Sequence, residues 1–446
     1  MLFHLLDIFT LHTQYLEIMK VPQPKLIPAI NRIVIGDVGS GKTLVAFISA
    51  ITFLHGIERG EAVLLAPTEV LAYQHYLKLL ELKAEEKNLI PWLDCIFLSG
   101  KGNYINGDKL PPSKFNIKIN ELMNQPNPKV FWVGTHAVLF NEMITPDMVM
   151  VDEQHRFGVR QREKLSKQQV EISPHFISFT ATPIPRTLAL TVYDTLEPIF
   201  VEVLQNRKPI QTSITTFDKL ETEVIAQIKN QLLENKKVYV ICTAVEQAEE
   251  TEDKKSLWSV TKTTKLMQKY FGDQVMSVHG KMNDKKDILS EFKSSETKNI
   301  LVATTVVEVG VDVGEATLVV ILNAERFGLS ALHQIRGRVG RNNYENNYCI
   351  LVTYKEFSFG KRLKFLCQHN DGFVLAQKDL ELRGAGDAIG STQSGFGSDI
   401  DQLIGLNPDL YTQIKNVVKS IYLDDLKELP RLEKYLQREK ERVWGE

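Results

Sequence analysis

A glycine-rich segment between two apolar runs constrains this chain more than any other feature of its sequence. Residues 31–46 read NRIVIGDVGSGKTLVA. The β-branched residues before the first glycine predict the end of a buried strand, and the residues from Thr43 onward are compatible with a helix. Glycines let backbone N–H groups approach anionic oxygens, and a helix N-terminus adds partial positive charge. The segment therefore predicts a strand, an anion-binding loop and a helix; a glycine-rich turn with a solvated lysine is the alternative.

The spacing within this loop assigns individual roles. Gly36, Gly41, Lys42 and Thr43 fit the pattern G-x-x-x-x-G-K-[ST]. In that pattern the lysine reaches the β- and γ-phosphates of a nucleotide, and the hydroxyl binds Mg²⁺. We therefore expect ATP and Mg²⁺ as cofactors, with Lys42 acting in catalysis and Thr43 as a metal ligand.

Length and composition limit the class of protein. With 446 residues the chain is too long for one core, and its length predicts about two or three domains. Its hydrophobic content of 43% and charged content of 24% are ordinary for a globular protein. The formal net charge is −2, so any nucleic-acid surface must be local. The four cysteines are far apart and form no C-x-x-C pair, which predicts thiols in a reducing cytoplasm.

The first 20 residues are apolar, yet they predict neither a signal peptide nor a membrane span. They lack a basic n-region, and His4, Asp7 and His12 interrupt them. We interpret them as an amphipathic helix and expect no membrane association.

Short apolar runs alternate with helical stretches along two successive parts of the chain. In the first part, polar residues follow directly after the strands predicted at 61–67, 130–133, 148–151 and 176–179. This arrangement indicates a doubly wound parallel sheet whose ligand lies along one edge. The pattern pauses near residues 204–209 and resumes from residue 225 as a second α/β unit. Its strands are predicted at 237–242, 274–278, 299–304, 318–322 and 348–352.

Other stretches depart from this alternation. Residues 101–129 are polar and rich in Asn and Pro, and we expect mostly loop with one short helix. From residue 361 the chain is helical, broken by a glycine-rich stretch at 384–397. The domains expected are an N-terminal helix at 1–20, α/β domains at 21–205 and 206–365, and a mostly helical segment at 366–446.

Two adjacent acids follow the strand predicted at 148–151. Asp152 and Glu153 begin the sequence DEQH. An acidic residue after a strand, in the same sheet as a phosphate loop, is typical of a Mg²⁺ ligand. We expect Asp152 to hold Mg²⁺ and Glu153 to orient and deprotonate the attacking water; a simple helix cap is the alternative.

A short stretch of the second unit carries several arginines. Residues 334–341 read QIRGRVGR. Planar guanidinium groups suit phosphate oxygens, and such arginines can stabilise a transferring γ-phosphate. We expect ATP to bind between the two units, so that hydrolysis opens and closes a cleft. A basic surface turn or a salt-bridge hub is the alternative.

Taken in order, these motifs resemble those of superfamily-two helicases, and most closely those of the RecG family of branched-DNA helicases. The matching segments begin with GDVGSGKT and end with LHQIRGRVGR. Between them lie APTEVLAYQH, GTHA, DEQHRFGVRQR, TATPIPRTLA, VHGKM and ATTVVEVGVDV. A transcription-coupling repair translocase shares TATPIPRT and the arginine motif, but DEQH and residues 370–395 favour RecG.

The resemblance implies two RecA-like doubly wound domains and an ATP-dependent helicase of recombination and repair. It implies a cytoplasmic monomer that binds double-stranded and branched DNA. The implied ATP contacts are Gly36, Gly39, Ser40, Gly41, Lys42, Thr43, Asp152, Glu153, Gly310, Asp312, Gln334, Arg338 and Arg341.

The same resemblance implies DNA-backbone and coupling residues. Hydroxyls and backbone N–H groups hold phosphates without reading bases. The residues implied are Pro67, Thr68, Gly134, Thr135, Thr180, Thr182, His279, Gly280, Thr304 and Thr305. Arg383 and Gln393 match the family's translocation motif, for which a flexible linker is the alternative.

The chain departs from the family pattern near its start. Family members carry a large wedge region before the phosphate loop, whereas 35 residues precede Gly36 here. Gln14 is a candidate for the adenine-reading glutamine, while Lys281 and Asn206 replace an arginine and a glycine. We therefore expect an N-terminally truncated member that needs a separate wedge polypeptide for fork regression. The alternative is a junction-blind, DNA-stimulated ATPase or a non-functional gene remnant.

Overall fold

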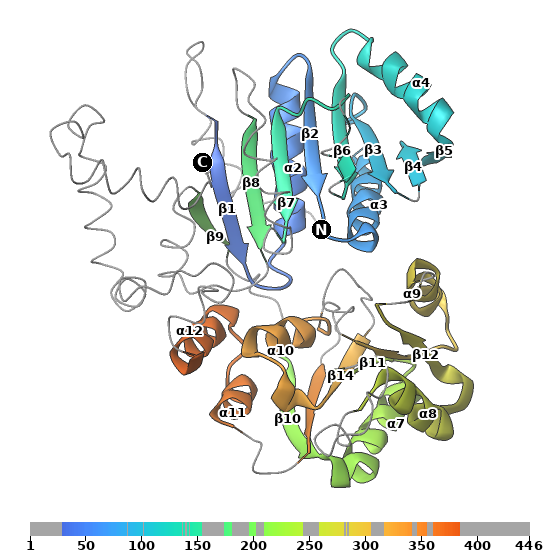
Figure 1. Cartoon of the computed structure of the whole chain (residues 1–446), viewed down its shortest axis with the longest axis vertical. Coiled ribbons are helices and arrows are strands. Elements are labelled where there is room, and N and C mark those ends of the chain that lie inside the picture. Colours follow the sequence, from blue (N-terminus) through green and yellow to red (C-terminus); the bar gives the residue numbers. More distant parts are fainter. Residues whose placement is uncertain are drawn as a thin grey trace, which may run out of the picture.

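Two α/β lobes make up the part of the chain that the structure, a computed structural model, describes (Figure 1). The described residues are 29–86, 88–100, 102–135, 137–138, 141, 143–153, 174–180, 196–201, 209–243, 258–280, 282, 285–304, 316–340, 346–354 and 360–383.

The first lobe is built on a nine-stranded sheet within these residues. Its strand order is β5-β4-β3-β6-β2-β7-β8-β1-β9, and β4 is antiparallel to its two neighbours while the other pairs are parallel. The strands are β1 (Asn31–Gly36), β2 (Gly60–Leu65), β3 (Asp94–Ser99), β4 (Gly102–Ile105), β5 (Asp108–Leu110), β6 (Lys129–Gly134), β7 (Met148–Asp152), β8 (His175–Thr180) and β9 (Glu197–Val201). The helices are α2 (Lys42–Gly56), α3 (Glu69–Glu85) and α4 (Pro112–Met123).

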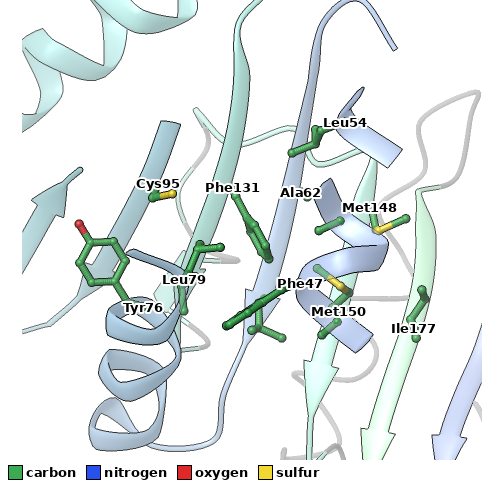
Figure 2. Packing of buried hydrophobic residues seen from close by; sticks show 14 of the residues in the cluster. Phe47, Leu54, Ala62, Tyr76, Leu79, Cys95, Phe131, Met148, Met150 and Ile177 are labelled. Carbon is green, nitrogen blue, oxygen red and sulfur yellow. The ribbon is translucent and has the colours of Figure 1, made fainter. Parts of the chain in front are cut away.

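The central strands of this sheet are apolar on both faces. All six residues of β2 are buried, as expected for a parallel sheet covered on both sides. Figure 2 shows one hydrophobic core of this lobe, in which Phe47 of α2 packs edge-on against Phe131 of β6, with ring centroids 6.0 Å apart. Fully burying one such side chain contributes about 1.5–3 kcal/mol. The sheet is therefore a rigid base for the loops at its edges.

The second lobe contains a six-stranded parallel sheet within the described residues. Its strand order is β10-β15-β14-β11-β13-β12. The strands are β10 (Gln211–Thr216), β11 (Lys237–Ile241), β12 (Val275–Val278), β13 (Ile300–Ala303), β14 (Ala316–Leu322) and β15 (Tyr348–Thr353). The helices are η3 (Phe217–Lys219), η4 (Leu220–Ile225), α7 (Ala226–Leu233), α8 (Val260–Phe271), η6 (Gly272–Gln274), α9 (Lys285–Ser294), η8 (Ala324–Arg326), α10 (Leu329–Arg336), α11 (Lys361–Gln368) and α12 (Gly372–Arg383).

The two lobes meet along one edge of the first sheet. The arrows of β1, β7 and β8 point toward the second lobe, and α10 and α12 lie on the side of that lobe facing them (Figure 1). Phe373 of α12 stacks edge-on against Phe200 of β9, with centroids 5.9 Å apart. The carboxyl ends of the first lobe's strands, where α/β sheets bind ligands, thus face the second lobe.

The fold prediction of two doubly wound parallel sheets is confirmed, but the loop predicted at 101–129 is wrong over its first part. Residues 102–110 form the hairpin β4–β5, whose turn places Asn106 and Gly107 at φ 49° and 100°. Asn-Gly is a strong hairpin turn, and the Gly107 N–H donates to the Tyr76 hydroxyl at 2.8 Å. Strands β9 and β10, at 197–201 and 211–216, were also not predicted. Their mixed polar and apolar residues match their places at the ends of the two sheets.

The structure also bears on the predicted free thiols and on the question of membrane-spanning helices. Cys95, Cys242 and Cys349 are buried free thiols, and burial raises the pKa of each to about 12. Among the described helices, none has the length and apolar character needed to span a bilayer.

Candidate functional site

The loop after β1 has the backbone that an anion-binding loop needs. Gly39 and Gly41 adopt φ 80° and 86°, a left-handed conformation that other residues adopt only at a cost. Helix α2 begins directly after Gly41, and no side chain caps its first N–H groups. These groups and the helix dipole together favour a bound anion.

Lys42 is held inside this loop. Its Nζ donates to the carbonyl oxygens of Gly36 and Asp37, both at 2.7 Å, and to Ser40 Oγ at 3.4 Å. A mobile four-carbon side chain is thus fixed with its ammonium group among the loop's backbone atoms. This places a positive charge where the loop would receive phosphate oxygens.

The sheet register places the acidic pair beside this loop. Asp152 of β7 lies opposite Phe179 of β8, which lies opposite Val34 of β1. Strands in a sheet are about 4.8 Å apart, so the β7 and β1 backbones are separated by roughly 10 Å. Asp152 and the phosphate loop therefore lie at the same sheet edge with one strand between them.

Two details of the acidic pair could not be predicted from its sequence. His75 Nε2, from α3, lies 2.9 Å from Asp152 Oδ2, and His75 is 5% exposed. Glu153 has φ 53°, and its N–H donates to the Phe179 carbonyl at 2.8 Å. A left-handed backbone at a residue other than glycine costs of order 1–3 kcal/mol and is concentrated at active sites. His75 orients one acid, and the strained turn sets the direction of the other.

The second lobe brings α10 against the phosphate loop. His333 Nε2 lies 2.5 Å from Asp37 Oδ1. A Cβ atom on Gly337 would lie 2.9 Å from the Cβ and Cγ1 atoms of Val38, so the two backbones approach too closely for a larger residue. Gln334 and Arg338 directly follow His333 and Gly337 in sequence, and their contacts with ATP stay predictions.

The arginines of residues 334–341 differ in role. Arg336 is 2% exposed, and its Nη1 donates to the carbonyl oxygens of Leu366 at 2.7 Å and His369 at 3.0 Å. Burial lowers the pKa of Arg336. Arg338, two residues later, is partly exposed. Arg336 is thus a buried structural arginine that binds backbone carbonyls and not the salt-bridge partners of the alternative, while the role of Arg338 stays a prediction.

The predicted DNA and coupling residues follow the carboxyl ends of strands. Thr68 caps α3, and its hydroxyl accepts from the Leu71 N–H at 3.3 Å. Thr180 ends β8 and is 2% exposed, and Thr304 follows β13 and is 7% exposed. Thr135 follows β6, and Arg383 is the last residue of α12. Their contacts with DNA stay predictions.

Several predicted residues lie outside the described part of the chain. They are Gln14, Thr182, Asn206, Lys281, Thr305, Gly310, Asp312, Arg341 and Gln393.

Two helicase families match this chain, one over the first lobe and one over the second. The DEAD/DEAH box helicase family matches residues 21–191, and the helicase conserved C-terminal domain matches residues 217–343. The "ATP-dependent DNA helicase RecG" of Synechocystis is 39% identical over 393 residues, which cover 86% of this chain and 43% of that protein. RecG of Aquifex aeolicus is 39% identical over 379 residues, covering 82% of this chain and 45% of that protein.

The chain belongs to the RecG family. It spans about half the length of the curated RecG proteins that it matches. A solved structure of RecG bound to a three-way DNA junction superposes with a TM-score of 0.63 at 29% identity, over 81% of this chain and 45% of that one. The two lobes are thus the RecA-like pair of RecG, and the predicted fold is confirmed.

Proposed function

We propose that this chain is an ATP-dependent DNA helicase or translocase that acts on double-stranded and branched DNA. The observation that supports it best is the meeting of the phosphate loop with α10 across the two lobes, through Asp37 and His333. An ATPase cleft divided between two lobes can convert nucleotide turnover into relative movement. The related RecG structure is described as bound to a three-way DNA junction, which supports the choice of substrate.

The residues of the first lobe suit ATP and Mg²⁺. The left-handed glycines and the N-terminus of α2 fit phosphate oxygens. The Thr43 hydroxyl and the Asp152 carboxylate would supply the hard oxygen ligands that Mg²⁺ prefers. When bound, Mg²⁺ would offset the negative charge of the phosphate groups. Lys42 would then exchange its carbonyl partners for phosphate oxygens.

Different residues accept the proton of the attacking water and stabilise the charge that develops on the transferring phosphoryl group. Glu153, directed by its strained backbone, takes the proton of the attacking water, while His75 keeps Asp152 in place. From the second lobe, Arg338 stabilises charge on the transferring phosphoryl group, and Gln334 lines the cleft. Arg341 has the same role by its position in the motif.

Further parts of the proposal rest on family membership. We propose that the two motor domains are residues 21–205 and 206–365, and that the chain acts as a monomer in the cytoplasm. Its process is DNA recombination and repair. Threonines at strand ends, Thr68, Thr135, Thr180 and Thr304, hold or sense the DNA backbone, and Arg383 and Gln393 serve translocation.

The decisive experiment measures ATP hydrolysis with and without duplex DNA. We expect DNA to stimulate phosphate release by the wild-type chain, and linear and branched DNA should be compared at one fixed salt concentration because phosphate contacts are salt-sensitive. A chain that binds ATP yet shows no DNA stimulation would favour the gene-remnant alternative.

A further inference from the structure

Asp37 of the phosphate loop joins three elements from both lobes. Its Oδ1 accepts hydrogen bonds from the Val38 N–H and from His333 Nε2, each at 2.5 Å, and its Oδ2 accepts from the Gly372 N–H at 3.1 Å. The Asp37 and His333 side chains are 3% and 4% exposed. A buried carboxylate is stable only when its oxygens accept such bonds. The phosphate loop, α10 and the start of α12 therefore meet at one carboxylate.

The hydrogen bonds of His333 fix its tautomer. Arg336 Nη2 lies 2.9 Å from His333 Nδ1. A guanidinium group can only donate, so Nδ1 accepts and the ring proton resides on Nε2, where it donates to Asp37. The imidazole is neutral and connects a buried cation to a buried anion. Protonating both ring nitrogens would set an N–H against the Arg336 guanidinium.

Arg336 and Asp37, at the two ends of this series of hydrogen bonds, bind the same segment of the second lobe. Arg336 donates to the carbonyl oxygens of Leu366, His369 and Asn370. Asp37, at the other end, accepts from Gly372. A Cβ atom on Gly372 would lie 2.8 Å from both Asp37 Cγ and His333 Nε2. The connection between α11 and α12 is thus packed directly onto the phosphate loop.

We propose that His333 is a positioning residue, which with Asp37 and Arg336 forms a relay that holds the phosphate loop, α10 and the start of α12 as one unit. The proposal rests on the ATPase function proposed above. The relay sets the distance between the loop and the neighbouring residues Gln334 and Arg338.

The test compares His333→Ala with His333→Gln and Ser330→Ala in the full chain. The glutamine amide keeps one donor and one acceptor, so it should restore part of the relay. Ser330 Oγ donates to Asp379 Oδ2 at 3.3 Å, which is a contact between α10 and α12 outside the relay. Ser330→Ala is therefore the matched control, expected to change kcat by less than about twofold.

We expect His333→Ala to lower kcat for DNA-stimulated ATP hydrolysis by on the order of 10- to 100-fold, as misplacement of catalytic groups does. KM for ATP should change by less than about threefold, because no relay side chain is expected to contact the nucleotide. Hydrogen exchange at the Gly372 amide should become about tenfold faster, since its region loses protection. Gly372→Ala should reproduce the loss of kcat.

Unchanged kcat together with unchanged exchange at Gly372 in a folded His333→Ala protein would overturn the relay. The exchange measurement needs no nucleotide. If the wild-type chain hydrolyses no ATP, the proposed function fails, and exchange at Gly372 in wild type against His333→Ala still decides the relay.

Discussion

The phosphate loop and α10 form opposite sides of one site, but they are built in different ways. The loop is made by neighbours in sequence: Gly36, Asp37 and Ser40 hold Lys42, which follows them within a few residues. The end of α10 is made by distant residues, because Arg336 is fixed by carbonyl groups about 30 positions away. The phosphate loop can be recognised by spacing alone. The end of α10 carries Arg336 and Arg338 of the same motif, and the structure distinguishes them by burial, since Arg336 is buried and Arg338 is partly exposed.

The largest expected effect tests Arg338, the partly exposed arginine of this motif. Arg338→Ala should lower kcat for ATP hydrolysis by roughly 10³–10⁵-fold, the contribution of an arginine that stabilises a transferring phosphoryl group. The free energy of unfolding should change by less than about 0.5 kcal/mol, because Arg338 is partly exposed. Phosphate release and denaturant unfolding measure the two quantities. A large loss of stability would show that Arg338 has a structural role like that of Arg336.

The second largest expected effect tests Glu153, the acidic residue with a left-handed backbone. Glu153→Gln should lower kcat by roughly 10²–10⁴-fold through loss of the general base, while ATP binding is retained. Lys42→Ala is the comparison, because it should weaken ATP affinity as well. Fluorescent-nucleotide titration and phosphate release separate these outcomes. Normal turnover by Glu153→Gln would remove that residue from the base role.

Arg336 should affect stability in addition to turnover. Arg336→Ala removes the donor from the carbonyl oxygens of Leu366, His369 and Asn370, of which Leu366 is buried, and a buried group left unpaired costs about 1–3 kcal/mol. We expect a loss of about 3 kcal/mol in the free energy of unfolding. Arg326→Ala, at an exposed arginine of the same lobe, is the control. Equal stability of the two variants would contradict the structural role of Arg336.

The smallest expected effect tests the local construction of the loop. Gly41→Ala should reduce stability by about 1–2 kcal/mol, because φ is 86° there and a left-handed backbone is costly for alanine. No atom lies within 4 Å of the added Cβ, so the loss is one of backbone conformation rather than crowding. Gly100→Ala is the matched control, since its site is equally open and lacks a positive φ. Equal melting temperatures would refute the strain argument.

Sequence alone predicted the elements whose causes are local. The phosphate loop, the acids after β7 and most of the strands follow from glycine spacing, polar residues at strand ends and apolar runs, whereas β3, β4, β5, β9 and β10 were not predicted. The turn of the hairpin at 102–110 also has a local cause, the dipeptide Asn106-Gly107. Its two strands are too short and too polar to give a strand pattern in the sequence.

Tertiary structure decided which side chains act on one another. His75 meets Asp152 over 77 positions, and His333 meets Asp37 over 296 positions. Spacing cannot reveal such pairs, because a hydrogen bond depends on where two elements pack and not on their order in the chain. The same holds for Arg336, whose motif suggests a phosphate partner while its burial assigns it to backbone carbonyls. The sequence thus determined the residues of the candidate ATP site, and the packing of the second lobe on the first determined which side chains contact one another.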